Sequence, residues 1–481
     1  MKRIHFRSHI AFLAGIFILR LLTSCAEEDT FSVSTANRLT FSTDTLKMDT
    51  TFSNVSTVTR SFWVYNHSGS GLRCSVIRLE NGNSSKYRVN VDGTYLNSIS
   101  GYKVNNIEIH DGDSIRVYVE LTPGSNGKTT PQLVADNLIF SLESGIEQKV
   151  NLSAYSWDAI LLNNVEINKD STIAQTTPIV IYGGLKVDSG ATLTIGEGTC
   201  IYFHNNAGIK VYGTLKTSGT AEQNITLRGD RLDNMFDYLP YDYTPGQWQG
   251  IHFYSSSYDN ELKYTDLHSA YNGIICDSSD INRQKLTLSA CTLHNNQGYG
   301  LEGINSKITA ENTQITNTLK NCAYFNGGEV TLNNCTVAQF YPFDADRGVA
   351  LRFSSVTSAL TNLEVRNSLI TGYADDEMSG EKGTKDTPFN YTFDHCIIRT
   401  PAVTTSDSIH FTHVTYENIS DTTKYGEKNF VKIDTELLRY DFHLSKISPA
   451  VNAADPLTTT EYDRDGKERD GKPDIGAYER Q

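Results

Sequence analysis

The residues best suited to bind a ligand in this sequence lie between Arg231 and Trp248, where five aromatic rings alternate with acidic side chains. An aromatic ring can stack on the C–H face of a neutral sugar, and a carboxylate can accept hydrogen bonds from its hydroxyl groups. The segment therefore predicts an exposed platform for a carbohydrate. The alternative is that the rings pack against a neighbouring wall, as most aromatic residues do. The candidate ligand-binding residues are Trp248, Tyr238, Tyr241, Tyr243, Asp237 and Asp242.

Three charged residues, at equivalent positions of a repeat that is described below, could form the active site of a lyase. We expect Glu311, Arg366 and Asp394 on an outward face. Clustered carboxylates there could bind Ca²⁺ beside an Arg base, as a pectate-lyase-like reaction requires. The simpler interpretation is a salt bridge between Arg366 and Asp394, which would stabilise the surface only slightly.

A second acidic group, Asp375, Asp376 and Glu377, lies in a polar insertion over residues 372–386. A glycoside hydrolase needs two carboxylates that face one glycosidic bond, and consecutive loop residues seldom converge in that way. The sequence has no Cys-x-x-Cys pair and no His-Glu-x-x-His motif, so it predicts no metal site and no cofactor. The catalytic residues stay unknown, and Ca²⁺ would be needed only if the protein were a lyase.

Three segments of the chain superimpose at a fixed interval of 22 residues: 286–293, 308–315 and 330–337. A period near twenty that is carried by short β-rich units is typical of a chain that coils on itself. Positions one, three, six and eight of each segment are mostly apolar or small, and positions two and four are polar. This pattern predicts two strands with one inward face. The middle of the chain is therefore expected to be a parallel β-solenoid.

The frame also predicts a corner between its two strands. The alternation slips by one residue between positions three and six, and position five is often Asn or His. Asn tolerates the left-handed backbone conformation that a sharp corner requires. Position six carries Cys or another small residue, so Cys291, Thr313 and Cys335 are expected to stack inward. Further copies of the frame begin at Leu262, Leu363, Tyr391 and Ile409.

Residues 38–155 and 431–481 do not follow the frame. The first of these segments contains about seven short strands between polar turns, which predicts an antiparallel β-sandwich of immunoglobulin-like type. An open solenoid end exposes unpaired strand edges that another segment has to cover. We therefore expect residues 431–481 to cap the last coil.

The N-terminus has the three parts of a secretory signal. Three basic residues precede a short apolar run over residues 11–19, and small residues follow. The apolar run is too short for a stable membrane-spanning helix, so residues 1–24 are predicted to be a cleaved signal peptide. The segment Leu22-Thr-Ser-Cys25 resembles a bacterial lipobox, and this resemblance implies lipid attachment at Cys25.

An acidic tether over residues 25–37 follows the lipobox. Its segment Ala26-Glu-Glu-Asp29 resembles the surface-export signal of Bacteroidota lipoproteins. The resemblance implies an outer membrane lipoprotein that is exposed at the cell surface, with the outer membrane as a partner through the lipid anchor.

The net charge argues against nucleic acid as a partner. The formal charge is −14, and removal of the four cations of residues 1–24 would make it −18. A chain of this charge repels phosphate backbones. The same charge disfavours a strongly anionic polysaccharide unless a local metal site reverses it.

Two further segments indicate a family. Ser448-Pro-Ala-Val-Asn452 and Asp474-Ile-Gly-Ala-Tyr-Glu479 resemble the C-terminal signature of secreted right-handed parallel β-helix repeat proteins. The segment from Phe41 to Val119, together with residues 191–195 and 213–217, is similar to uncharacterised Bacteroidota surface lipoproteins of this architecture. The resemblance implies a fold and a location but no activity.

The sequence as a whole predicts an all-β protein: a right-handed parallel β-helix preceded by an immunoglobulin-like β-sandwich. Recognition of a glycan or another extracellular macromolecule, without catalysis, is the leading function. An extracellular polysaccharide lyase or glycoside hydrolase is the alternative, and a structural surface spacer is the third. The predicted divisions are residues 1–24, 25–37, 38–155, 156–430 and 431–481.

Overall fold

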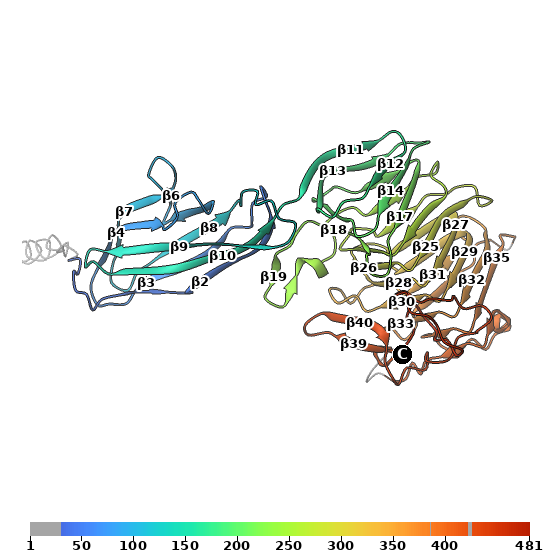
Figure 1. Ribbon diagram of the computed structural model, residues 1–481. Helices are drawn as coiled ribbons and strands as arrows, with labels where there is room; N and C mark the ends of the chain where they lie inside the picture. Colours follow the sequence, from blue (N-terminus) through green and yellow to red (C-terminus); the bar gives the residue numbers. More distant parts are fainter. Residues whose placement is uncertain (1–29, 385, 422–425) are drawn as a thin grey trace, which may run out of the picture. The chain divides into compact units, whose positions relative to one another are not determined.

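The computed structural model describes residues 30–384, 386–421 and 426–481 (Figure 1). The predicted signal peptide and the predicted lipid attachment at Cys25 lie outside the described residues. Within the described residues, all regular structure is β-strand apart from three short 3-10 turns, and no helix is long and apolar enough to cross a membrane.

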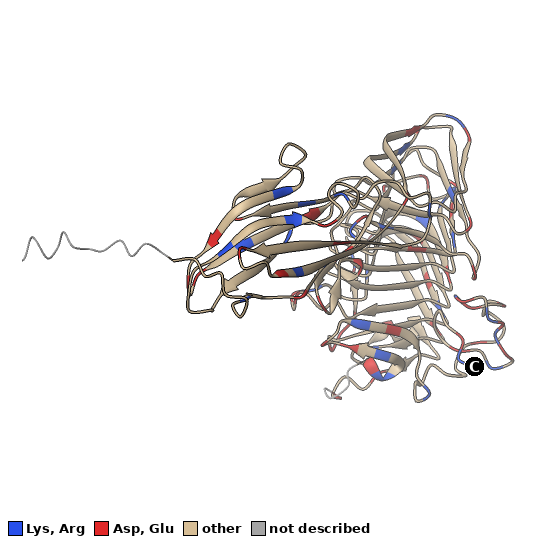
Figure 2. Cartoon of the chain, turned by 60° about the vertical axis from the view of Figure 1, so that its left-hand side comes forward, with Lys and Arg blue, Asp and Glu red and all other residues tan. Residues whose placement is uncertain are grey.

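The chain divides into two compact units. Of the described residues, the first unit comprises 30–48, 54–124 and 133–155, and the second comprises 49–53, 125–132 and those from 156 onward. Lys and Arg residues lie among Asp and Glu residues in both units (Figure 2).

The first ten strands form a β-sandwich of two five-stranded sheets. Their orders are β1-β3-β8-β5-β6 and β2-β10-β9-β4-β7. Alternate apolar side chains of both sheets meet in one core, in which Val64, Val117 and Phe140 are fully buried. The structure has ten strands where the sequence predicted about seven, because β2, β6 and β7 are rich in polar residues and resemble turns. The strands are β1 (Leu39–Phe41), β2 (Thr45–Phe52), β3 (Arg60–Asn66), β4 (Leu72–Leu79), β5 (Tyr87–Val91), β6 (Thr94–Leu96), β7 (Lys103–Ile109), β8 (Ser114–Leu121), β9 (Gln132–Leu142) and β10 (Glu147–Trp157).

The second unit contains one continuous sheet of 26 strands, in which successive coils pair in parallel. The protein is therefore all-β, and this unit is the parallel β-helix that the repeats predicted. The strands are β11 (Ile160–Ile167), β12 (Ser171–Ile173), β13 (Ile179–Val187), β14 (Thr192–Gly196), β15 (Cys200–Phe203), β16 (Ile209–Val211), β17 (Thr214–Ser218), β18 (Ile225–Gly229), β21 (Ile251–Phe253), β22 (Asn260–Lys263), β23 (Thr265–His268), β24 (Ile274–Cys276), β25 (Gln284–Ser289), β26 (Thr292–Asn296), β27 (Leu301–Glu311), β28 (Gln314–Thr318), β29 (Ala323–Asn333), β30 (Thr336–Gln339), β31 (Leu351–Ser354), β32 (Leu360–Arg366), β33 (Leu369–Gly372), β34 (Met378–Glu381), β35 (Phe389–Asp394), β36 (Ile397–Ile398), β37 (Phe411–Thr412) and β38 (Thr415–Tyr416).

The register between coils confirms the predicted frame. Leu286 of β25 lies opposite Ile308 of β27, and Ile308 lies opposite Val330 of β29. One copy was placed wrongly: Leu262 lies opposite Leu288 and so occupies position three. The coil begins with Asn260 at position one, and this polar residue hides the start of the frame.

The corners have the predicted left-handed conformation. Position five has φ values between 44° and 53° in seven successive coils. Asn suits this position because it adopts such a φ at less cost than most other residues, and Ala and Tyr occupy it where the sequence lacks Asn or His. The corner residues are Tyr264, Ala290, Asn312, Asn334, Asn367, His395 and His413.

The residue that follows each corner points into the core. Cys291, Thr313 and Cys335 are fully buried, as predicted. The Cys291 thiol donates to the carbonyl oxygen of Leu262 in the preceding coil, and the Cys335 thiol donates in the same way to Ala310. Burial raises the pKa of Cys335 to about 12, so this thiol is an unreactive core group.

The sequence analysis expected the tail to cap the last coil, but the tail covers several coils. It runs along one side of the β-helix, over the strands that follow the corner: β18, β23, β26, β28, β30, β33 and β36, here called the flank face. The amide side chains of the Asn corners are polar groups that recur in several coils, and the tail bonds to them. Asn312 Nδ2 donates to the carbonyl oxygen of Tyr462, Asn334 Oδ1 accepts from the Thr460 N–H, and Asn367 Oδ1 accepts from the Asp455 N–H.

A hairpin of the tail also packs on the flank face. It consists of β39 (Phe430–Asp434) and β40 (Arg439–Leu444), preceded by the turns η2 (Ser406–His410) and η3 (Glu427–Asn429). Phe430 and Phe442 share an apolar cluster with Phe340 and Leu369. Outward side chains of the flank face are therefore buried beneath the tail.

Replacing Thr313 by Arg is expected to prevent folding or to lower the unfolding temperature sharply, because the new charge would have no partner among Cys291, Cys335 and their neighbours. Thr313→Cys is the matched control, since it repeats the residue of the adjacent coils. Soluble yield and thermal unfolding by circular dichroism measure both. If Thr313→Arg unfolded at the same temperature as the wild type, position six would have to face outward.

Candidate binding cleft

The insertion that contains the predicted platform interrupts the coil between β18 and β21. It forms a small hairpin of β19 (Asn234–Phe236) and β20 (Leu239–Pro240), followed by the 3-10 turn η1 (Tyr241–Tyr243). The six candidate residues of this segment do not lie together, and the structure separates them into three places.

Trp248 is not part of an exposed platform, and that prediction was wrong. Its side chain is 0% exposed and stacks on Phe203 with ring centroids 4.3 Å apart. The indole Nε1 donates to the carbonyl oxygen of His268 at 2.8 Å. Trp248 pairs in parallel with Ala270 of the next coil, so the coil has already resumed at this residue and directs the ring into the core.

The hairpin tip carries exposed rings. Phe236 and Tyr238 are 55% and 44% exposed, and their rings stack with centroids 5.9 Å apart. Asp237 lies between them and is exposed. Tyr241 is half-buried, because the guanidinium of Arg231 lies 3.7 Å from its ring centroid.

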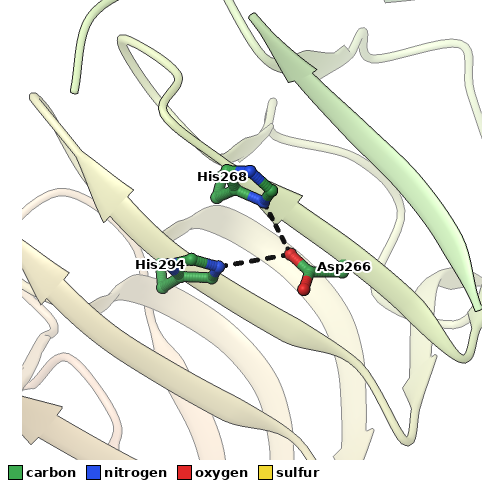
Figure 3. Close-up of side chains that lie close together, drawn as sticks. All are labelled: Asp266, His268 and His294. Carbon is green, nitrogen blue, oxygen red and sulfur yellow. Dashed lines mark hydrogen bonds and ion pairs between the residues drawn. The ribbon is translucent and has the colours of Figure 1, made fainter. Parts of the chain in front are cut away.

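Asp242, the next predicted residue, belongs to an ionic network on the flank face. Its Oδ1 lies 2.5 Å from Arg228 Nη1 and 2.8 Å from His268 Nε2. The other ring nitrogen of His268 lies 2.8 Å from Asp266 Oδ1, and His294 Nε2 lies 3.3 Å from that same oxygen (Figure 3). The imidazole of His268 therefore bridges two carboxylates.

The parallel register explains why these side chains meet. Asp266 and His268 are two residues apart in β23 and so share a face of the strand. His294 of β26 lies opposite His268, and their rings stack with centroids 4.6 Å apart. Sequence reasoning missed this group. The available signal was the frame with its start corrected to Asn260, because His268 and His294 then directly follow it at the same place in successive coils.

The network fixes the charges of its members. Burial lowers the pKa of His268, but the carboxylates of Asp266 and Asp242 outweigh burial and raise the pKa to about 9. Burial raises the pKa of Asp242, but His268 and Arg228 outweigh it and lower the pKa to about 2. The ring is therefore a cation at neutral pH, held between two anions.

A cleft of about 390 Å³ lies beside this network, and we call it the flank cleft. Its floor comes from β26 and β28, one rim comes from the insertion, and the other comes from the tail. Arg439 of the tail lies 4.7 Å from the ring centroid of Tyr243, which joins the two rims. The lining residues are Tyr243, Thr292, His294, Asn295, Gln314, Asn317, Tyr440, Asp441, Phe442, His443 and Tyr478.

On the tail side of the flank cleft, as in the network around His268, a histidine bridges two carboxylates. His443 lies 2.6 Å from Asp441 and 2.8 Å from Asp465, and the bond to Asp465 raises its pKa despite burial. Its ring lies 4.2 Å from that of Tyr478. Asn317 Oδ1 and Tyr440 Oη have no hydrogen-bond partner among the described residues. The cleft thus combines aromatic surface with charged groups and amide side chains.

The acidic groups considered for catalysis do not converge. Asp375 lies 3.4 Å from Arg399, whereas Asp376 accepts from Thr400 and Glu377 accepts from the backbone N–H of Ala350. The predicted salt bridge between Arg366 and Asp394 is not formed, and each residue pairs with other groups. Arg366 pairs with Glu364 at 3.4 Å, and Asp394 lies 3.0 Å from His413 Nδ1.

A larger groove of about 580 Å³ lies over β13, β16 and β21. Much of its lining is glycine backbone, with the amide side chains of Asn164, Asn206 and Asn272 at its edges. Tyr254 is the one tyrosine among its lining residues, and its ring stacks on that of His252 with centroids 4.1 Å apart. The flank cleft is therefore the better site for a ligand that needs ring surface.

Neither a protein-family model nor a curated protein matches this chain. Among solved structures, pectate lyase Pel9A is 13% identical and aligns over 67% of this chain and 97% of its own, with a TM-score of 0.27. A family 123 glycoside hydrolase from Clostridium perfringens is 8% identical over 26% of each chain, with a TM-score of 0.18.

The VesB protease of Vibrio cholerae is 14% identical and aligns over 25% of this chain and 32% of its own, with a TM-score of 0.17. This chain thus spans about a third or less of the length of the protease and of the glycoside hydrolase. All three TM-scores are below 0.5, so these similarities carry no argument about the function of the chain.

Trp248→Ala is expected to destabilise the second unit by about 3–5 kcal/mol, because it removes a buried ring and its stacking contact with Phe203. Chemical denaturation followed by tryptophan-independent circular dichroism measures the change. Tyr238→Ala, at the exposed hairpin tip, is the control and should change stability little. Equal stabilities of the two variants would contradict the buried position of Trp248.

Proposed function

We propose that this protein binds a polysaccharide in the flank cleft and holds it at the cell surface without catalysis. The observation that carries the proposal is the composition of the cleft, in which Tyr243, Tyr440 and Tyr478 lie among hydrogen-bonding side chains. Sugar rings stack on such surfaces, and their hydroxyl groups bond to carboxylates and amides. The volume of about 390 Å³ is in the range of small-ligand sites.

The charges of the cleft favour a neutral or weakly charged glycan. Asp441 of the lining is paired with His443, and Asp242 and Asp266 beside the cleft are paired with arginine or histidine, so no concentrated positive field is present. A strongly anionic polymer would meet a mature chain of high negative charge. Hydroxyl groups, by contrast, can bond to both the donors and the acceptors of the walls.

A polysaccharide lyase or glycoside hydrolase is the second candidate function. The observation that favours it is the ionic network of Asp242, Asp266, His268 and Arg228 beside the cleft, because acid–base chemistry needs charged and titratable groups close to the reacting bond. Reducing-end assays and assays for unsaturated products, on each glycan that binds, separate the two functions. Turnover by the wild type that is lost in Asp242→Asn would establish the enzyme.

Tyr243→Ala is expected to weaken glycan binding severalfold, since a stacking ring contributes on the order of 1 kcal/mol beyond area burial. A glycan array supplies the ligand, and titration calorimetry measures the affinity. The half-buried position of Tyr243 should let the variant fold, which a thermal melt checks.

Tyr238→Ala is the matched control for this titration, because the same ring is removed at the hairpin tip outside the cleft. Unchanged binding by Tyr238→Ala together with weaker binding by Tyr243→Ala supports the flank cleft. The reverse result would move the site to the hairpin tip and overturn the assignment.

The location of the protein is proposed from its N-terminus. The lipobox-like segment supports lipid attachment at Cys25 and an outer membrane address, and the acidic tether supports exposure at the cell surface. Cys25→Ala should then abolish incorporation of a labelled fatty acid and release the protein from the membrane fraction. Cys200→Ala is the control, because it removes a different cysteine and keeps Cys25. Label retained by Cys25→Ala would contradict the proposal.

A further inference from the structure

We propose that Asp266, His268 and His294 form a binding site for a divalent transition metal, with Zn²⁺ as the ion for which the donor set is best suited. The site goes beyond glycan binding and does not depend on it. It rests on three features of the flank face: the positions of the donor atoms, the carboxylate behind His268, and the opening toward the flank cleft.

The donor atoms already lie at nearly the spacing of a metal site. One carboxylate oxygen of Asp266, His268 Nδ1 and His294 Nε2 all fall within 4.8 Å of one another. With metal–ligand bonds of about 2.0 Å, tetrahedral ligand atoms are about 3.3 Å apart. The distance from His294 Nε2 to Asp266 Oδ1 is 3.3 Å, and that from His268 Nδ1 is 2.8 Å. The distance between His268 Nδ1 and Asp266 Oδ1, now 2.8 Å, would have to lengthen by about 0.5 Å to admit the ion.

Asp242 supplies the outer support that metal-binding histidines usually have. Its carboxylate accepts from His268 Nε2 at 2.8 Å, which leaves Nδ1 directed at Asp266 and orients the ring. Arg228 in turn holds Asp242, and the Trp248 indole donates to the backbone oxygen of His268. The ring is therefore fixed by groups that would not themselves touch the ion.

The donor set selects the class of metal. Two imidazoles and one carboxylate suit Zn²⁺ and other first-row transition ions, whereas Ca²⁺ and Mg²⁺ prefer oxygen ligands alone. The ion would take the place of the proton between His268 Nδ1 and Asp266 Oδ1, and that proton would leave to solvent.

The site has room for a further ligand. Three protein donors leave at least one position of a tetrahedral ion open. His294 also lines the flank cleft, and its side chain is 19% exposed, so the open position can face that cavity. An oxygen of water, or of a molecule bound in the cleft, could occupy it.

A second group of the same composition serves as the internal comparison. Asp394, His395 and His413 also bring three donor atoms within 4.8 Å. The His413 side chain is 64% exposed, and both histidines direct Nδ1 at the same carboxylate. No carboxylate within hydrogen-bond distance of the other ring nitrogen is found for this group in the part of the chain that the structure describes. We therefore expect it to bind metal more weakly.

The test is titration of the purified, chelator-treated protein with Zn²⁺ by calorimetry, and with Co²⁺ by visible absorption. The wild type should bind one ion tightly, and neither Ca²⁺ nor Mg²⁺ should compete. His294→Asn should weaken binding at least tenfold, and His413→Asn should leave it unchanged. Co²⁺ bound at the site should give absorption bands typical of nitrogen and oxygen ligands. His294→Asn should change these bands.

Asp242→Asn keeps all three ligands and serves as a second variant if His294→Asn fails to fold. Loss of an outer-shell carboxylate should weaken binding by about 10- to 100-fold. The proposal is overturned if the wild type binds no Zn²⁺, if the ligand variant binds like the wild type, or if His413→Asn removes the tight site. The glycan-binding proposal is unaffected by any of these results.

Discussion

The left-handed corner at position five is the constraint on which the second unit depends. Each corner turns the chain from one face of the β-helix to the next at the same position of its frame, so the strands stay in parallel register although the coils differ in length. Register then fixes which side chains point inward, as in the stack of Cys291, Thr313 and Cys335. It also lines up outward side chains in rows, and one such row brings His268 and His294 together. The register that the corners set therefore determines both the packing of the core and the side chains that lie beside the flank cleft.

The flank face is covered, and this cover creates the site. A bare β-helix presents a flat outer surface, on which a small ligand finds little enclosure. The insertion lies over the flank face from one side and the tail lies over it from the other, with Arg439 and Tyr243 in contact between them. The tail is held by amides of corner residues such as Asn312 and Asn334. Corner residues therefore serve both the coil and the segment that encloses the cleft.

The repeat, the corners and the inward stack could be predicted because they recur along the chain and have a local physical cause. Trp248 could not be placed, because its neighbours suggested a loop whereas its pairing with Ala270 puts it in the coil. The network around His268 was missed because Asp242, Asp266 and His294 are far apart in sequence. Their outward positions are polar in many coils, so composition alone gives no sign of a site. The tail was expected at the coil end because no sequence pattern indicates which corner amides it bonds to.

The central claim is that a ligand binds in the flank cleft, between the insertion and the tail. Hydrogen–deuterium exchange of the protein with and without its saturating glycan tests this claim most directly, because it needs no substitution. The account predicts slower exchange in residues 241–243, 292–295 and 439–443 and unchanged exchange in the β-sandwich. Protection confined to residues 183–186 and 206–210, in the larger groove, would contradict it.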